Sequence, residues 1–200
     1  MSAHVEYLSK DNKLKKIISK QQPVVLTTRN NVHLHICSSI ISQQLSTKVA
    51  AVIYGRFLEL FKKKTPAPAD ILSVPFDELR AIGLSNSKTT YVQNVCNFFI
   101  ANKVTDKKLH KMENEELIVF LVQIKGIGRW TAEMILMFTL GREDVFAVDD
   151  LGIQQAMIKL YDLDVSNKKQ LKEDMIRISS KWSPYRTYAC RYLWSWKDGK

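Results

Sequence analysis

The stretch LIVFLVQIKGIGRWTAEMILMFTLGREDVFAVDD, Leu117 to Asp150, decides the fold of this chain. An apolar helical pattern leads into Lys125-Gly126-Ile127-Gly128, and a second amphipathic pattern leaves from Arg129 and Trp130. Two glycines at alternate positions permit a tight turn. The first turn of the following helix offers N–H groups and the positive end of the helix dipole, which together suit a phosphate. The pattern predicts a helical hairpin that holds phosphate, although a purely structural hairpin explains the glycines equally well.

Composition favours a folded protein with an acidic partner. The chain has 200 residues, of which 46% are hydrophobic, so it is long enough for one domain or for two lobes that share a core. The net charge is +10 and the sequence pI is about 9.5. Nucleic acid is the commonest acidic partner of such a protein. A soluble basic protein without a specific partner is the alternative that composition leaves open.

Several classes of protein are disfavoured by what the sequence lacks. No apolar run approaches the roughly 20 residues that span a bilayer, and residues 1–20 hold no long apolar segment typical of a secretory signal. The cysteines are few and widely spaced, which suits reduced thiols inside a cell and forms neither a zinc nor an iron–sulfur pattern: Cys37, Cys96 and Cys190. His33 and His35 are interpreted as structural or surface residues.

Apolar spacing and end signals predict an all-α chain. The β-branched run Val24–Thr28 could be extended, but a single strand makes no sheet. Helices are expected over 11–19, 32–44, 46–61 and 75–82, then after a cap at Ser87, from Asn114 into the hairpin, from Asp149 or Asp150 to Lys159, after a cap at Ser166, and from Ser183-Pro184 onward. Gly83 and Gly141 are expected to end helices.

An acidic pair, Asp149 and Asp150, follows the second helix of the hairpin in the sequence. The second hairpin helix is about ten residues, or about 15 Å, and the loop after it can bring Asp149 or Asp150 back close to Trp130. A carboxylate beside a phosphate-binding element repels DNA, yet it stabilises positive charge that develops on a substrate. Breaking a glycosidic bond produces such charge, because its transition state resembles an oxocarbenium ion. The structural alternatives are a helix cap for the acids, Asp149 above all, and a core position for Trp130.

The lysine groups are interpreted as mainly solvated faces, of which one could meet DNA: Lys62–Lys64, Lys107/Lys108 and Lys168/Lys169.

Four segments in order resemble one family. They are Ile40–Ser46, Gly83–Ser85 with Lys88, Ile124–Ala132 followed by Val148–Gly152, and Trp182–Ala189. Together they are similar to the helix–hairpin–helix DNA glycosylases, and to their 3-methyladenine DNA glycosylase II branch in particular, from about Ile36 to Trp196. The resemblance implies a two-lobed all-α bundle with its active-site cleft between the lobes. Lobe one would take roughly 1–35 and 145–200, and lobe two roughly 36–144 with the hairpin at about 114–140.

The resemblance also assigns roles. Asp150 matches the catalytic aspartate, and its place at a helix start favours the ionised form. Trp130, Trp194 and Met134 match positions around the pocket for a base flipped out of the duplex, where electron-rich rings suit a cationic alkylated purine. Residues that would contact DNA are Lys125, Gly126, Gly128, Arg129, Thr131, Gln44 and Leu45, the last two as candidates to fill the vacated gap. No catalytic metal or cofactor is implied, although hairpin carbonyls near Gly126 and Gly128 could hold a monovalent cation.

Departures from the family pattern narrow the expected activity. Strand-cutting relatives carry a lysine at the position of Trp130, so its absence implies hydrolysis that leaves an abasic site. Met134 replaces a tyrosine common in close relatives, which suggests a softer pocket wall. The expected enzyme acts as a monomer on double-stranded DNA that contains alkylated bases, in the bacterial cytoplasm or nucleoid or in a nucleus. A DNA-binding protein without turnover, and a glycosylase for other damaged or mismatched bases, remain as alternatives.

Overall fold

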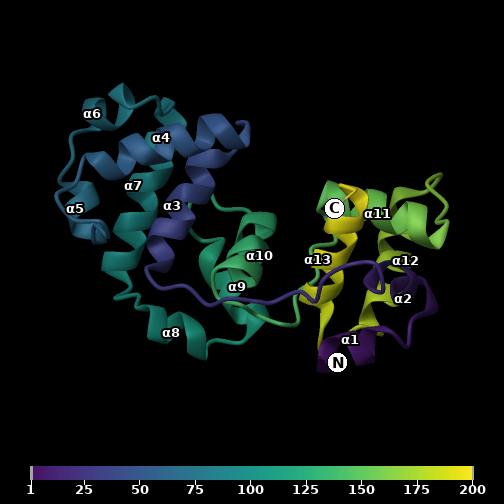
Figure 1. Ribbon diagram of the computed structural model, residues 1–200. Coiled ribbons are helices and arrows are strands. Elements are labelled where there is room, and N and C mark those ends of the chain that lie inside the picture. Colours follow the sequence, from purple (N-terminus) through teal and green to yellow (C-terminus); the bar gives the residue numbers. More distant parts are fainter. Residues whose placement is uncertain (1, 200) are drawn as a thin grey trace. The chain divides into compact units, whose positions relative to one another are not determined.

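The computed structural model describes residues 2–199, and every regular element in that range is an α-helix (Figure 1). The all-α prediction is therefore confirmed. The chain divides into two compact units: a terminal unit, Met1–Thr28 with Leu136–Lys200, and a central unit, Arg29–Ile135. The division into two lobes with boundaries near residues 35 and 145 stays a prediction. Within residues 2–199, no helix is both long enough and apolar enough to cross a membrane.

The central unit is built around α7. Its helices are α3 (Val32–Ser42), α4 (Thr47–Glu59), α5 (Pro68–Leu72), α6 (Phe76–Ala81), α7 (Asn86–Ala101), α8 (Asp106–Lys111) and α9 (Asn114–Leu121). Helices α3, α5 and α6 all pack against α7, and α4 packs against α3. Apolar residues at helical spacing on α3 and α7 are buried there, including Ile36, Ile40, Val92 and Val95. Helix α10 (Arg129–Phe138) starts in this unit and ends in the terminal unit.

The terminal unit contains both ends of the chain (Figure 1). Its helices are α1 (Ala3–Leu8), α2 (Asn12–Ile18), α11 (Leu151–Tyr161), α12 (Lys168–Ser180) and α13 (Arg186–Lys197). Helix α13 packs against both α11 and α2. Its aromatic residues were expected to be mainly core, and Tyr188 and Tyr192 are indeed buried.

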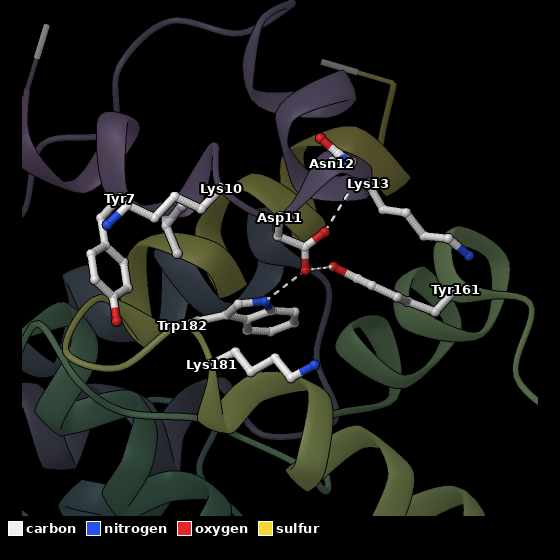
Figure 2. A pocket seen from close by; sticks show the side chains of 9 residues that line it. Tyr7, Lys10, Asp11, Asn12, Lys13, Tyr161, Lys181 and Trp182 are labelled. Atoms are coloured by element: carbon white, nitrogen blue, oxygen red, sulfur yellow. Dashed lines mark hydrogen bonds between the residues drawn. The ribbon is translucent and has the colours of Figure 1, made fainter.

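The carboxylate of Asp11 joins three parts of the terminal unit (Figure 2). Asp11 caps α2, since its Oδ1 accepts hydrogen bonds from the backbone N–H groups of Lys13 and Leu14. Its Oδ2 accepts from the Tyr161 hydroxyl at 2.7 Å and from Trp182 Nε1 at 3.2 Å. A hollow of about 470 Å³ opens beside these residues. Because Tyr161 is the last residue of α11, this junction lies at the opposite end of that helix from Asp150.

Two predicted helix caps are wrong by one or two residues. The cap of α7 is Ser85, whose hydroxyl accepts from the N–H of Lys88 at 3.2 Å, and not Ser87. The cap of α12 is Asn167, and not Ser166. Both errors arise where several residues able to cap stand in succession, so the sequence signal alone does not choose among them.

The predicted start of the last helix is also wrong. Helix α13 begins at Arg186, two residues after the proline that was expected in its first turn. The Ser183 hydroxyl donates to Asp144 Oδ2 at 2.8 Å instead of capping the helix. Arg186 makes two further bonds to the same carboxylate, at 2.6 and 2.9 Å, which anchors this helix start to the segment before Asp150.

Candidate DNA-binding and catalytic site

The hairpin turn is shaped by one glycine and supported by α7. Gly126 has φ of +107°, in the left-handed region that side chains resist. A Cβ at this position would lie 2.3 Å from Cγ of Tyr91, so the turn and the tyrosine pack in direct contact. One residue earlier, the carbonyl of Lys125 accepts a hydrogen bond from Asn94 Nδ2 at 3.2 Å. The predicted hairpin between α9 and α10 is thus present, and α7 fixes its conformation.

The second glycine leaves the start of α10 open. Nothing lies within 4 Å of a Cβ placed on Gly128, and this residue is exposed. The amides that follow belong to the first turn of a ten-residue helix, where N–H groups lack intrahelical acceptors. Thr131 is buried, only 4% exposed, so its predicted contact with DNA stays a prediction. The geometry suits an anion approaching along the helix axis.

Arg129 is engaged within the protein. Its guanidinium meets the Glu115 carboxylate at 2.7 and 2.8 Å and donates from Nε to Glu133 at 3.0 Å. The pKa of Arg129 is raised, chiefly by the hydrogen bond to Glu115, and the pKa of Glu115 is lowered by the same bond. Its predicted contact with DNA therefore stays a prediction, and it would have to compete with Glu115. Lys125 is exposed at the turn itself.

Asp150 is the N-cap of α11. Its Oδ1 accepts hydrogen bonds from the backbone N–H of Ile153 and from Nε1 of Trp194, each at 2.8 Å. The neighbouring Asp149 is exposed and pairs with Lys172 at 2.7 Å. The helix-cap alternative, weighed above all for Asp149, applies in the structure to Asp150. The two carboxylates thus differ sharply: one is partly buried and held by directed N–H groups, and the other is a surface ion pair.

Trp194 belongs to an aromatic group in the terminal unit that the sequence identified only in part. Its ring lies 5.7 Å from the ring of Phe138, at an interplanar angle of 32°. The guanidinium of Arg191 lies over the ring of Phe138, 5.1 Å from its centroid. Partial burial lowers the pKa of Arg191. A hollow of about 800 Å³ is lined by these three side chains together with Ser195, Asp198 and residues 20–25.

Phe138 and Arg191 were not singled out from the sequence. Phe138 falls eight residues after Trp130, and i, i+4, i+8 spacing places Trp130, Met134 and Phe138 along one face of α10. This spacing is the sequence signal that could have identified Phe138. Trp130 is 43% exposed, which argues against the alternative that it is a core residue. Met134 is half-buried.

Gln44 and Leu45 occupy the turn between α3 and α4. Gln44 is exposed and has φ of +59°, so the backbone presents it at the tip of the turn. Lys88 on α7 fixes this turn, because its Nζ donates to the carbonyls of Ile41 at 2.8 Å and Gln43 at 2.7 Å. Desolvation lowers the pKa of Lys88. The two candidate gap-filling residues therefore sit on a supported turn, although their contact with DNA stays a prediction.

No group of three or more His, Cys, Asp or Glu side chains suited to a metal ion occurs among residues 2–199. Hairpin carbonyls already accept protein donors: that of Ile124 from the N–H of Ile127 at 2.9 Å, and that of Gly128 from the N–H of Ala132 at 3.1 Å. A carbonyl oxygen has a second lone pair, so these bonds are compatible with the monovalent cation predicted there.

Comparison with known proteins places this chain in a family. A family model described as HhH-GPD superfamily base excision DNA repair protein matches residues 37–182. DNA-3-methyladenine glycosylase 1 of Schizosaccharomyces pombe is 34% identical over 184 residues, which cover 91% of this chain and 79% of that protein. Among solved structures, a DNA-3-methyladenine glycosidase from Bacillus halodurans matches with a TM-score of 0.86 and 36% identity, over 98% of this chain and 89% of that one. The Schizosaccharomyces pombe glycosylase Mag1 in complex with abasic DNA matches with a TM-score of 0.83 and 31% identity, over 97% and 96% of the two chains. The chain therefore belongs to the HhH-GPD superfamily of base excision DNA repair proteins.

Proposed function

We propose that this protein is a monofunctional glycosylase that removes alkylated purines, such as 3-methyladenine, from double-stranded DNA. One observation carries the proposal: the Asp150 carboxylate is oriented at a helix start by Trp194 and Ile153, in a chain that also carries the phosphate-binding hairpin. The names of similar proteins support the class of substrate. The protein acts as a monomer, on DNA within the bacterial cytoplasm or nucleoid or within a nucleus.

The reaction breaks one bond and makes one. The C1′–N bond of the damaged nucleotide breaks, its electron pair leaves with the base, and the sugar becomes cationic. Water then adds to C1′ and loses a proton, which leaves an abasic site. The Asp150 carboxylate stabilises the cationic sugar electrostatically, because a fixed negative charge lowers the energy of a transition state that gains positive charge.

Base recognition and backbone binding fall to separate groups. The target base must leave the duplex before the glycosidic bond is accessible. Trp130, Met134 and Trp194 are the side chains that we assign to contact with the flipped base, and Gln44 or Leu45 is assigned to the space that it leaves. The hairpin amides near Gly126 and Gly128, with Lys125, bind backbone phosphate and position the strand.

The absence of a lysine at position 130 supports hydrolysis without strand cleavage. A Schiff base with the sugar needs an amine beside C1′. The residue at that position here is Trp130, which has no nucleophilic nitrogen. We therefore expect the product strand to remain intact until it is treated with alkali.

The test compares two neighbouring carboxylates. Methylated duplex DNA is incubated with the unmodified protein, with Asp150→Asn and with Asp149→Asn, and released bases are measured by chromatography. Asp150→Asn should slow release by at least about 100-fold, the scale expected for a catalytic carboxylate. Asp149→Asn removes the same charge one residue away, where it only pairs with Lys172, and should stay within about twofold.

The outcomes separate the alternatives. Equal release by the unmodified protein and Asp150→Asn would refute the catalytic assignment. Binding without any release would favour a DNA-binding protein that lacks turnover. Release from oxidised or mismatched DNA, but not from methylated DNA, would assign a different substrate to the same site.

A further inference from the structure

The first turn of α11 and the indole of Trp194 on α13 meet at a residue without a side chain. Helices α11 and α13 pack side by side in the terminal unit (Figure 1). A Cβ on Gly152 would lie 3.0 Å from Cδ1 and 3.1 Å from Nε1 of Trp194. It would also lie 3.1 Å from Oδ1 of Asp150. The position of Gly152 is therefore next to both partners of the 2.8 Å indole–carboxylate hydrogen bond.

We infer that Trp194 is a positioning residue for Asp150, and that Gly152 is the residue that allows the indole to reach the carboxylate. This inference rests on the proposed catalytic role of Asp150. Both described donors, the Ile153 N–H and the Trp194 indole N–H, meet the same oxygen. Two donors that converge from different helices restrict rotation of the carboxylate about its Cβ–Cγ bond, whereas a helix cap alone supplies one.

The hydrogen bond also fixes the indole. A Trp ring held at its Nε1 edge by Asp150 and packed beside Phe138 is restricted in its rotation. Base recognition and orientation of the charge would then be set by a single contact. A glycosidic bond cleaved through a cationic sugar needs the carboxylate within a narrow range of positions, because electrostatic stabilisation depends on preorganised geometry.

Alanine at position 152 should disturb the hydrogen bond between Trp194 and Asp150. Separations of 3.0–3.1 Å are tighter than ordinary van der Waals contact, so the indole or the carboxylate must move by a few tenths of an ångström. Alanine is otherwise favourable inside a helix, where it stabilises relative to glycine. Gly152→Ala should therefore lower activity without lowering stability, a combination that a purely structural role for Gly152 does not produce.

The experiment measures the single-turnover rate of base release and the dissociation constant for methylated duplex DNA. The proteins are the unmodified chain, Gly152→Ala, Trp194→Phe and the double variant. Each single variant should slow release by about 10- to 100-fold, the scale of a hydrogen bond to a charged group. Gly152→Ala should leave the dissociation constant within about threefold. The double variant should be no slower than the slower single variant, because both changes remove the same hydrogen bond.

Gly55→Ala in α4 is the matched control, since nothing lies within 4 Å of a Cβ placed there. It should release bases at the unmodified rate. Additive losses in the double variant, or an unmodified rate in Gly152→Ala, would overturn the inference. The Asp150→Asn variant distinguishes failure of this inference from failure of the proposed function. If Asp150→Asn is inactive while Gly152→Ala and Trp194→Phe keep the full rate, the catalytic role stands and only the positioning role fails.

Discussion

The ring of Tyr91 packs directly against the backbone of Gly126, so that a Cβ on the glycine would overlap the ring at 2.3 Å from Cγ. This contact joins the middle of α7 to the turn that binds phosphate in the proposed function. Two features require glycine at that turn: the contact with Tyr91 and the φ of +107°.

Replacing Gly126 by alanine should therefore destabilise the fold as well as the hairpin. Left-handed backbone strain and overpacking each cost about 1–3 kcal/mol, so the free energy of unfolding should fall by about 2–6 kcal/mol. Urea denaturation measures the change. Gly128→Ala is the control, because a Cβ there meets nothing within 4 Å, and its stability should change by no more than about 1 kcal/mol. Equal losses in the two variants would show that the Tyr91 contact has no special weight.

Lys88→Met should loosen the turn that carries Gln44. The methionine keeps the apolar stem but removes two hydrogen bonds to the carbonyls of Ile41 and Gln43. Loss of such bonds costs about 1–3 kcal/mol of stability. If Gln44 or Leu45 supports the flipped state, release from duplex DNA should fall more than release from single-stranded DNA, where no gap must be filled. Equal losses on the two substrates would argue that the turn has no part in base flipping.

The parts of the site that the sequence predicted rest on short-range signals. The hairpin is marked by two glycines between helical patterns, and the acidic pair Asp149 and Asp150 by its place at a helix start, whereas the choice of Asp150 within the pair comes from the family resemblance. Helix α9 begins at Asn114 as expected, and Gly141, with φ of +64°, follows α10 as its expected end. Each of these depends on residues within one or two turns of each other.

The parts that the sequence did not predict depend on contacts between distant residues. Trp194 and Asp150 are 44 positions apart, and Trp182 and Asp11 are 171 apart. The importance of Gly152 lies in an indole from another helix, which no local pattern reports. Three short helices were also missed, α1, α5 and α8, because five or six residues span too few turns to show an apolar period.

Glu115→Gln should strengthen DNA binding. The change removes a carboxylate that now holds Arg129 at 2.7 Å and that repels phosphate approaching α10. The dissociation constant should decrease by about two- to fivefold at low ionic strength, with a smaller effect as salt screens the charges. Glu173→Gln, an exposed glutamate on α12, controls for the gain of one net positive charge. Equal effects from both substitutions would mean that overall charge, and not release of Arg129, explains the gain.

Stability should depend on pH through Asp11. Partial burial raises the pKa of this carboxyl, but hydrogen bonds from Tyr161, Trp182 and the backbone outweigh it, so the pKa lies below its ordinary value. A lowered folded-state pKa contributes stability that is present above the unfolded-state pKa of about 3.9 and is lost as pH falls through the folded-state value. The stability difference between the unmodified protein and Asp11→Asn should be constant from pH 5 to 7 and should shrink below about pH 4. A difference that is unchanged at pH 3 would contradict the role of the ionised form.

Two tryptophans should separate function from folding. Trp130 is 43% exposed, whereas Trp182 is 1% exposed and donates to Asp11. Trp182→Ala leaves a large cavity and should cost at least about 3 kcal/mol of stability, while release per folded molecule stays near the unmodified rate. Trp130→Ala should cost less than about 2 kcal/mol, because much of the ring is already in water, yet release should fall at least about tenfold as the base loses a stacking partner. Thermal unfolding together with single-turnover release measures both quantities. If Trp130→Ala lost stability as severely as Trp182→Ala, the ring would be a core residue, and its match to the base pocket would have to be abandoned.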